Sequence, residues 1–385
     1  MDYGFTEEQM MIKDLCRQIA EEKIKPVREH YDVTGEFPWD IVKVMAEADL
    51  FGLSIEEQYG GMGGGVLDTV LAVEELSKAC GGIALALAAT GLGTYPILLF
   101  GNEEQKKKYL PNIAAGKTLA AFCLTEAEAG SDAGGTQTTA VRDGDEFILN
   151  GTKQWITNGS EAEIYTVIAL TNKAKGPRGA SAFIVEKGTP GLSFSKKENK
   201  MGIRASATTE VIFQDCRIPA ENMIGREGQG FMVAMKTLDK SRPGVAAQAL
   251  GIAAGALDEA IQYSRQRRQF GKTICSFQGI QFMLADMATQ VEASRALVYQ
   301  ASRHIDLGHK DISRESAMCK LLAGDTAMRV TTDAVQIFGG YGYMKEYPVE
   351  KMMRDAKITQ IYEGTNQIQR EVIALSLIKE AAKKR

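Results

Sequence analysis

Apolar residues recur along this chain with two different periods, and the change of period predicts three domains. Between positions 5 and 116 the spacing is helical, as at Ile12, Leu15 and Ile19, which are three and four residues apart. Such residues share one face of a helix. A glycine-rich turn at 59–65 separates two helical segments. Residues 1–118 are therefore predicted to form an N-terminal all-α domain.

The pattern changes after position 118. Short runs rich in β-branched and aromatic residues occur at 146–149, 165–169, 182–185 and 210–213, and pairs such as Asp143-Gly144 and Asn158-Gly159 punctuate them. Runs of this length between turn residues are typical of strands. Residues 119–229 are predicted to form a middle antiparallel β-barrel or β-sandwich domain.

The last part of the chain is helical again. Long helices are predicted near 229–266, 277–307 and 312–337, and a helix after Glu363 completes a four-helix bundle. Residues 230–385 form this C-terminal domain. The fold class is α+β and multidomain.

Composition narrows the function classes. The net charge of −4 gives no indication of a nucleic-acid partner, and no apolar run is expected to span a membrane. The first eight residues contain three acids and no base, so neither a signal peptide nor a transit peptide is expected. We expect a bacterial-type cytoplasm, or an organelle after processing.

Cysteine and histidine usage argues against a metal site. The six cysteines lie tens of residues apart, and only three histidines occur. No spacing suits zinc or a disulfide framework, so the cysteines are expected to be small buried side chains in a reducing compartment.

Two tripeptides resemble the end of a phosphate-binding loop, but neither belongs to a complete motif. Gly116-Lys117-Thr118 and Gly271-Lys272-Thr273 lack the required earlier glycine, since Pro111 and Gln266 occupy that position. No GxGxxG occurs, and helices do not alternate with strands, which disfavours a doubly wound dinucleotide fold.

The stretch 360–367 holds one carboxylate, Glu363, in an otherwise uncharged setting beside Tyr362 and Gly364. Poor solvation raises the pKa of a carboxyl group, as a general base for removing a proton from carbon requires. The same stretch is also compatible with a solvated loop glutamate before a helix capped by Thr365 or Asn366.

Five segments in order carry a resemblance. They are 122–132 (FCLTEAEAGSD), 153–159 (KQWITNG), 267–272 (RRQFGK), 336–342 (QIFGGYG) and 360–367 (QIYEGTNQ). Together they resemble the acyl-CoA dehydrogenase family over essentially the whole chain, and are most similar to its short-chain (butyryl-CoA type) and medium-chain members.

The resemblance implies FAD as cofactor. Thr125 and Thr157 look like the threonines that hydrogen-bond the flavin ring, Trp155 like the aromatic packed against it, and Arg267 like the arginine that reaches the pyrophosphate from a neighbouring subunit. From the residues alone, Trp155 could instead be a core residue of the β domain, and Arg267 a solvated helix end. The remaining implied FAD contacts are Phe122, Leu124, Ile156, Phe270, Gln278, Gln336, Gly340, Thr365 and Gln367.

The resemblance also implies substrate contacts and partners. The implied contacts with the acyl-CoA are Ser131, Asp239, Arg242, Tyr362 and Gly364. Without it, Asp239 and Arg242 would be an i,i+3 surface pair. A cofactor shared across subunits implies a homo-oligomer, a tetramer, and the family's partner is an electron-transferring flavoprotein.

The implied reaction is α,β-dehydrogenation. Glu363 removes the α-proton, a hydride passes from the β-carbon to flavin N5, and the product is a trans-2-enoyl-CoA. The family has a second base position just before the helix arginine, but Ser241 stands there, so Glu363 is the candidate base. Glu126 and Glu128 are interpreted as structural or surface carboxylates. Ala127 replaces the proline usual in the family, which affects local rigidity and not the chemistry.

The acyl pocket is expected to be lined partly by residues 83–96, which contain no charge. Glutaryl-type members place an arginine in this helix, where Gly82-Ile83-Ala84 stand here, so a dicarboxylic substrate is disfavoured. A short apolar acyl group is favoured, with branched or alicyclic groups open. Two alternatives remain: an enoyl-CoA reductase that runs the same chemistry in reverse, and a non-catalytic CoA-binding helical scaffold.

Overall fold

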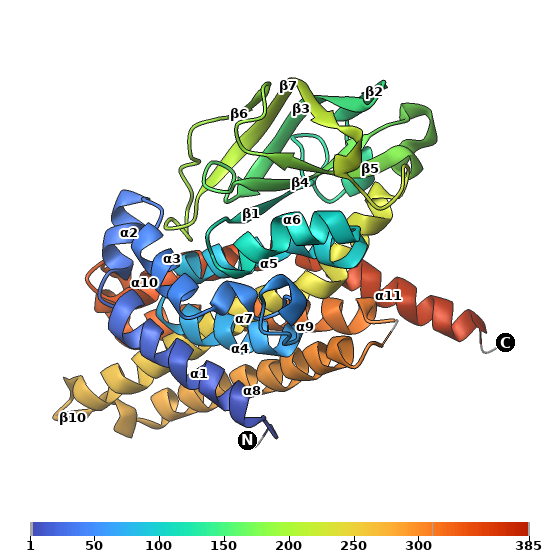
Figure 1. Ribbon diagram of the computed structural model, residues 1–385. Helices are drawn as coiled ribbons and strands as arrows, with labels where there is room; N and C mark the ends of the chain where they lie inside the picture. The colour runs from blue at the N-terminus through green and yellow to red at the C-terminus, as the bar shows by residue number, and fades with distance from the viewer. Residues whose placement is uncertain (1–2, 310, 384–385) are drawn as a thin grey trace.

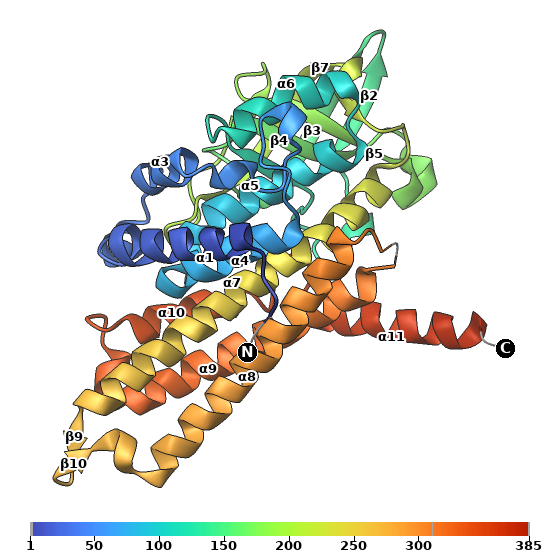
Figure 2. The ribbon, with the colours of Figure 1, turned by 60° about the horizontal axis from the view of Figure 1, so that its bottom comes forward.

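The computed structural model describes residues 3–309 and 311–383. A β-sheet domain lies over two groups of helices, and the C-terminal helix projects from the side of the molecule (Figure 1). Figure 2 shows that the longest helices run through the whole helical part, so that one end of each lies far from the sheet.

The first group of helices covers the face of the molecule below the sheet. Its members are α1 (Glu7–Ile19), α2 (Arg28–Thr34), α3 (Trp39–Glu47), α4 (Val66–Ala79), α5 (Gly81–Phe100) and α6 (Glu103–Ala114). Local sequence fixes where two of them begin. Thr6 and Gln9 form a capping box at the start of α1, and Asn102 and Gln105 do the same for α6. The prediction of helices in this region is confirmed.

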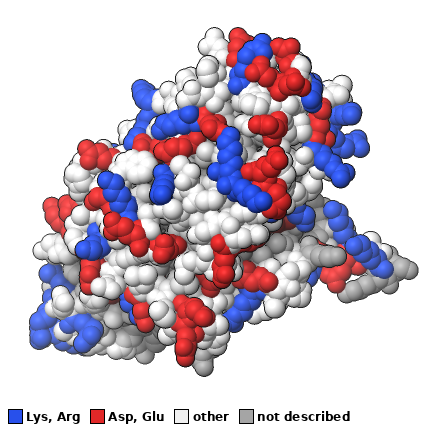
Figure 3. Space-filling model, viewed as in Figure 1, with Lys and Arg blue, Asp and Glu red and all other residues white. Residues whose placement is uncertain are grey.

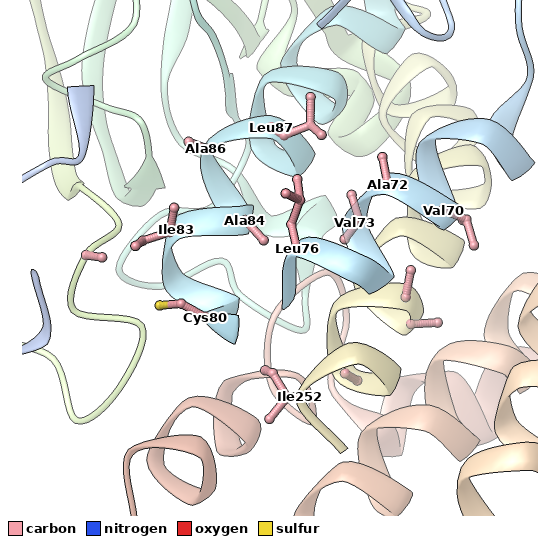
Figure 4. Close-up of a cluster of buried hydrophobic side chains, with 14 of the residues drawn as sticks. Val70, Ala72, Val73, Leu76, Cys80, Ile83, Ala84, Ala86, Leu87 and Ile252 are labelled. Atoms are coloured by element: carbon pink, nitrogen blue, oxygen red, sulfur yellow. The ribbon is translucent and has the colours of Figure 1, made fainter. Parts of the chain in front are cut away.

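Helices α4 and α5 form the centre of the core. Val70, Val73 and Leu76 of α4 lie beside Ile83 and other side chains of α5 in one buried cluster (Figure 4). A side chain from α7 (Gly230–Gln266) enters the same cluster, since Ile252 lies so close to Gly81 that a Cβ there would be 2.6 Å from its Cδ1. The first helices are thus packed directly on the C-terminal ones.

The expectation that no apolar run could span a membrane is wrong by length and composition. Two helices are long and apolar enough, α5 and Gly230–Gln266, with 67% and 78% of the respective windows buried inside the protein. Both pack against other helices of this chain, and α5 also contacts the sheet. Burial in the protein core therefore accounts for their apolar composition.

The middle domain contains one sheet of eight strands within the described residues. They are β1 (Ala120–Cys123), β2 (Thr139–Asp143), β3 (Glu146–Thr157), β4 (Ile164–Leu170), β5 (Ala180–Glu186), β6 (Leu192–Phe194), β7 (Thr208–Pro219) and β8 (Met223–Ile224). The order is β6-β7-β3-β2-β4-β5-β8, and β1 pairs with β4.

The predicted β domain is present, but its strands are not all antiparallel. β1 runs parallel to β4, with Ala120 opposite Ile164, and β2 has a parallel contact with β4. β4 is buried along its whole length, because β1 and α5 cover it. Alternation of apolar residues reports burial and not strand direction, so the sequence pattern could not show this difference.

Three C-terminal helices match the predicted ranges within about one residue: α7 (Gly230–Gln266), α8 (Gln278–Asp306) and α9 (Ser313–Phe338). They are followed by α10 (Pro348–Ile358) and by α11 (Asn366–Lys383), the helix expected after Glu363. A hairpin, β9 (Arg268–Gln269) and β10 (Lys272–Thr273), joins α7 to α8. Helix α11 contacts α9 near its start, where Asn366 and Gln369 are buried, and the rest projects. Helix α10, not expected as a separate element, packs against α7 and α9.

Two smaller expectations can also be compared with the structure. Five cysteines are buried as expected, but Cys275 is only half-buried. Acidic and basic side chains are intermixed on the face in Figure 3, apart from a basic group at the end of the molecule where the β9–β10 hairpin lies. Exposed basic residues of this hairpin are Arg268 and Lys272.

Candidate active site

A cavity of about 410 Å³ lies where α5, α7, the sheet and the loop after α10 meet. Its wall combines apolar side chains with a small number of polar ones, as ligand sites usually do. The lining residues are Leu85, Ala89, Leu92, Phe122, Leu124, Thr125, Gly130, Ser131, Asp132, Ala133, Gly134, Trp155, Ile156, Thr157, Pro177, Phe231, Met235, Leu238, Arg242, Tyr362, Glu363, Gly364 and Ile368. Three of the five sequence segments therefore meet at this cavity.

Glu363 lies in a turn whose backbone is held in an unusual conformation. Its φ is 52° and that of Gly364 is 88°, both in the left-handed region that costs a non-glycine residue energy. Side chains hold the turn in place. Lys320 Nζ donates to the Gly364 carbonyl at 2.8 Å, and Gln369 Nε2 donates to the carbonyls of Glu363 and Gly364 at 3.2 and 2.9 Å.

The carboxylate of Glu363 faces the cavity and is poorly solvated. Burial raises its pKa, while the hydrogen bond from Ser241 and the charges of Arg242 and Lys320 act in the opposite direction. Ser241 Oγ donates to Glu363 Oε2 at 2.5 Å. The effect of burial is the larger one, as the isolated acid in the sequence led us to expect. Lys320 was not predicted to lie here.

Arg242 forms part of the same wall. Its Nη1 is 3.1 Å from Asp239 Oδ1, and the two residues are only 5% and 6% exposed, so the interpretation of a surface pair is wrong. The Nε of Arg242 is buried without a hydrogen-bond partner. A buried donor beside a cavity is satisfied when a ligand supplies an acceptor. Asp239 does not line the cavity; it accepts from Ser313 Oγ at 2.5 Å.

A buried ion pair supports the loop that carries Thr125. Lys153 Nζ donates to Glu126 Oε1 at 2.7 Å, to the Leu124 carbonyl at 3.0 Å and to Thr136 Oγ1 at 3.0 Å. Glu126 also accepts from the backbone N–H groups of residues 137 and 138. Glu126 is thus a structural carboxylate and Glu128 is exposed, as predicted.

Trp155 is presented to the cavity and not to the core. It is 57% exposed with a φ of 55°, which excludes the alternative of a buried β-domain residue. Its segment is tied to the Thr125 loop, because the Gln154 N–H donates to the Thr125 carbonyl at 2.8 Å. Thr125, Trp155 and Thr157 therefore form one wall, where an exposed aromatic side chain and hydroxyl groups suit a flat ring with polar edges.

Several predicted cofactor contacts lie elsewhere. Arg267 and Gly340 line a second cavity of about 400 Å³ with Tyr263, Gln269, Ile274, Ile337, Phe338, Gly339, Tyr341 and Met344. It lies beside the β9–β10 hairpin, at the end of α7 remote from the sheet (Figure 2). The guanidinium of Arg267 lies over the Tyr341 ring, 5.2 Å from its centroid. Phe270 in the hairpin is 93% exposed.

The last predicted contacts do not line either cavity. Gln278 and Gln336 are exposed, as is Gln367. The hydroxyl of Thr365 accepts from the Ile368 N–H at 3.2 Å, so it acts as the helix cap considered from the sequence. Within one chain, the structure does not bring Arg267, Phe270, Gln278, Gln336 and Gly340 to the cavity of Glu363.

Comparisons with known proteins identify the class. Three family models match in order: the acyl-CoA dehydrogenase N-terminal domain over residues 6–117, the middle domain over 121–216 and the C-terminal domain over 228–378. The chain belongs to the acyl-CoA dehydrogenase family. It is an oxidoreductase of the flavoprotein type, with FAD as cofactor.

Individual relatives cover nearly the whole chain. The butyryl-CoA dehydrogenase structure from Megasphaera elsdenii is 50% identical, with a TM-score of 0.96 over 98% of this chain and 100% of that one. A chain in the structure described as the electron transferring flavoprotein of Acidaminococcus fermentans, on flavin-based electron bifurcation, is 54% identical, with a TM-score of 0.96 and coverage of 98% and 99%. The acryloyl-CoA reductase (NADH) of Anaerotignum propionicum is 51% identical over 98% of this chain and 96% of its own.

Proposed function

We propose that this protein dehydrogenates a short-chain acyl-CoA at the α,β position to give a trans-2-enoyl-CoA. The observation that supports this best is the carboxylate of Glu363. It faces a partly apolar cavity, burial raises its pKa, and a strained backbone turn fixes its position. A general base for a carbon acid requires such an environment.

Several residues of this chain have separate roles at the proposed active site. Glu363 takes the α-proton, and its backbone N–H donates to the thioester oxygen as negative charge develops there. The apolar side chains of α5 and α7 exclude water, which increases the basicity of the carboxylate. Ser131, Tyr362 and Gly364 line the cavity where the thioester end of the substrate would lie. FAD, when bound against the wall of Thr125, Trp155 and Thr157, supplies the two-electron acceptor chemistry.

The acyl end of the cavity favours a short apolar group. Leu85, Ala89 and Leu92 of α5 line it without a charge. Gly82 is closely packed, since a Cβ at this position would lie 3.1 Å from the Ile203 Cα, and the helix carries no arginine there. A second carboxylate on the substrate would therefore be buried without a cationic partner in this helix, which is unfavourable.

An acyl-CoA panel tests this substrate class. We expect the highest kcat/KM with a short straight, branched or alicyclic acyl group and a glutaryl-CoA rate at least tenfold lower, measured with an artificial electron acceptor. A preference for glutaryl-CoA or for a long chain would contradict the proposal.

We also propose that each FAD site is built by two chains of a homotetramer. None of the predicted contacts Arg267, Phe270, Gln278, Gln336 and Gly340 lines the cavity of Glu363 in its own chain. Arg267 and Gly340 line the second cavity, and the other three lie in the β9–β10 hairpin, at the start of α8 and near the end of α9. Arginine is well suited to a pyrophosphate because it forms bidentate charge-assisted bonds.

The projecting helix α11 supports an oligomer. Leu375, Leu377 and Ile378 are between 47% and 64% exposed on it, and large exposed apolar side chains grouped on one element commonly mark an interface. We expect the intact protein to have the mass of four chains in solution; a monomer with full flavin content would contradict the shared site.

Subunit complementation tests the shared site directly. Arg267→Ala and Glu363→Gln chains are refolded separately and as a mixture. In the mixture, some sites combine Glu363 from one chain with Arg267 from the other. We expect activity to return in the mixture and not in either variant alone; no recovery in mixed oligomers would show that one chain holds the whole site.

The physiological direction has a specific alternative. One relative is named an acryloyl-CoA reductase, and another matched chain belongs to a structure of an electron transferring flavoprotein. We propose such a flavoprotein as the electron partner and oxidation as the direction, with enoyl-CoA reduction as the second candidate. Supplying the flavoprotein oxidised or reduced and following the acyl product separates the two. The proposed compartment, a bacterial cytoplasm, is tested by cell fractionation.

A further inference from the structure

Helix α7 lacks one backbone hydrogen bond in the turn that contains Ser241, next to the proposed base Glu363. Pro243 lies inside it and has no N–H, so the Asp239 carbonyl lacks its helical donor. The hydroxyl of Ser316 on α9 donates to that carbonyl at 2.5 Å instead. This turn of α7 is therefore fixed to α9, and Ser241 within it is held against the loop that carries Glu363.

Ser241 directs its only hydroxyl proton toward the base. The residue is 6% exposed, and its Oγ lies 2.5 Å from Glu363 Oε2. The alternative acceptor, the Leu238 carbonyl, is 3.4 Å away. The short distance is typical of a hydroxyl group bonded to an ionised carboxylate. This contact stabilises the charged form of Glu363 over the neutral form.

The other groups around the carboxylate come from four elements. Arg242 on α7 and Lys320 on α9 attract it, and burial lowers the pKa of Lys320 to about 8. Tyr95 on α5 and Tyr362 in the loop are neutral phenols, because burial raises the pKa of each hydroxyl group above its ordinary value. Ser241 differs from all of them because it does not titrate, so its contribution to the base is constant with pH.

We propose that Ser241 is a positioning residue for the base. Its hydroxyl group, which α7 presents, holds one carboxylate oxygen of Glu363 in place. The same hydrogen bond keeps the carboxylate ionised at a lower pH than burial would otherwise allow. The second oxygen is thereby left for the α-carbon of the substrate. This inference rests on the proposed function, since it assigns a pKa-setting group to the proposed base.

The Ser241→Ala variant tests the inference through its pH profile. Removal of a hydrogen bond to an ionised carboxylate typically raises the pKa of that carboxyl group by about one unit. The acid limb of kcat/KM should therefore move to higher pH by that amount, with about a tenfold lower rate on the limb and little change on the alkaline plateau. Ser241→Thr, which keeps a hydroxyl group, should restore much of the wild-type profile.

Controls separate this role from a packing role. Ser264 is buried on the same helix and donates to the Ile261 carbonyl, so Ser264→Ala removes the same atom away from the base. We expect its acid limb to match that of the wild type. FAD content and thermal midpoint are measured for every variant. An isotope-edited infrared titration of the Glu363 carboxyl group then reports its pKa without turnover.

The outcomes distinguish the two proposals. An unmoved acid limb and an unmoved infrared titration in Ser241→Ala, with Glu363→Gln inactive, would overturn the role of Ser241 and leave the proposed function intact. A Glu363→Gln variant with wild-type turnover would overturn both. If Ser241→Ala does not fold, Ser241→Cys takes its place, because a thiol has a similar shape and is a much weaker donor; an unmoved infrared titration in that variant would overturn the role.

Discussion

Replacing Lys153 with methionine should destabilise the middle domain strongly. The ammonium group is fully buried and lies 2.7 Å from Glu126. Methionine has a similar length but no donors, so the change leaves the Glu126 carboxylate with only its hydroxyl and backbone N–H partners.

The magnitude follows from the pKa of Glu126. Burial raises this pKa, but the charge and hydrogen bond of Lys153, together with the hydrogen bonds from Thr136 and Thr138, outweigh burial and lower it from 4.5 to about 2. At about 1.4 kcal/mol per pKa unit, that difference corresponds to about 3.5 kcal/mol for all partners of Glu126 together. Because the desolvation of Lys153 opposes part of this, the net contribution of the pair is smaller. The removal of one partner from a buried pair nevertheless costs about 3–5 kcal/mol.

Urea unfolding of wild type and Lys153→Met, followed by tryptophan fluorescence, measures the difference in unfolding free energy. Because the folded pKa of Glu126 is depressed, its stabilisation is present above about pH 4.5 and is lost as the pH falls toward 2. The difference between the variants should shrink over that interval. Lys25→Met removes an exposed pair with Glu21 and should cost less than about 0.5 kcal/mol. A loss below about 1 kcal/mol for Lys153→Met at pH 7 would refute the reasoning.

Three further predictions follow from single contacts. Gly93→Ala should cost about 1–3 kcal/mol, because its Cβ would lie 2.6 Å from the Ala121 N, whereas Gly91→Ala on the same helix meets nothing within 4 Å and should be neutral or stabilising in the same unfolding assay. Arg354→Lys should cost about 1.5 kcal/mol in unfolding free energy, since lysine cannot reproduce the two-pronged contact with Asp32 at 3.2 and 2.7 Å. Glu363→Gln should raise the thermal midpoint at alkaline pH but not at acid pH: the folded pKa of Glu363 is raised, so its contribution to stability is present at low pH and is lost as pH rises through the folded pKa.

The long helices could be predicted from the sequence because their signals are local. The expected 277–307 and the observed Gln278–Asp306 agree because apolar periodicity and flanking glycines define both ends. The direction of β1 relative to β4 could not be predicted, since apolar runs of a buried strand carry no direction. Helix α10 was missed because the predicted bundle left the stretch between α9 and Glu363 without an element, although Pro348 is a good helix start.

The candidate site likewise combines residues that local sequence features identify with residues that only the packing of distant segments brings together. Glu363 stood out as an isolated acid, but the resemblance carried by all five segments was needed to favour a base over a solvated loop glutamate. Its partner Lys320 was missed, since a lysine among apolar residues of a helix can be read as a solvated position; only the packing of α9 on the loop places its Nζ at the Gly364 carbonyl. Arg242 was predicted by resemblance, but its burial with Asp239 depends on the packing of α7 against α9 and was not predicted.

The claim that Glu363 is the carbon base is tested most directly by hydrogen exchange at the α-carbon. Butyryl-CoA is incubated in D₂O with the FAD-loaded protein and no electron acceptor, and deuterium uptake is followed by mass spectrometry for wild type and Glu363→Gln at equal flavin content. We predict that the variant exchanges about 10²- to 10⁴-fold more slowly. Equal exchange rates in the two proteins would contradict the assignment of the base.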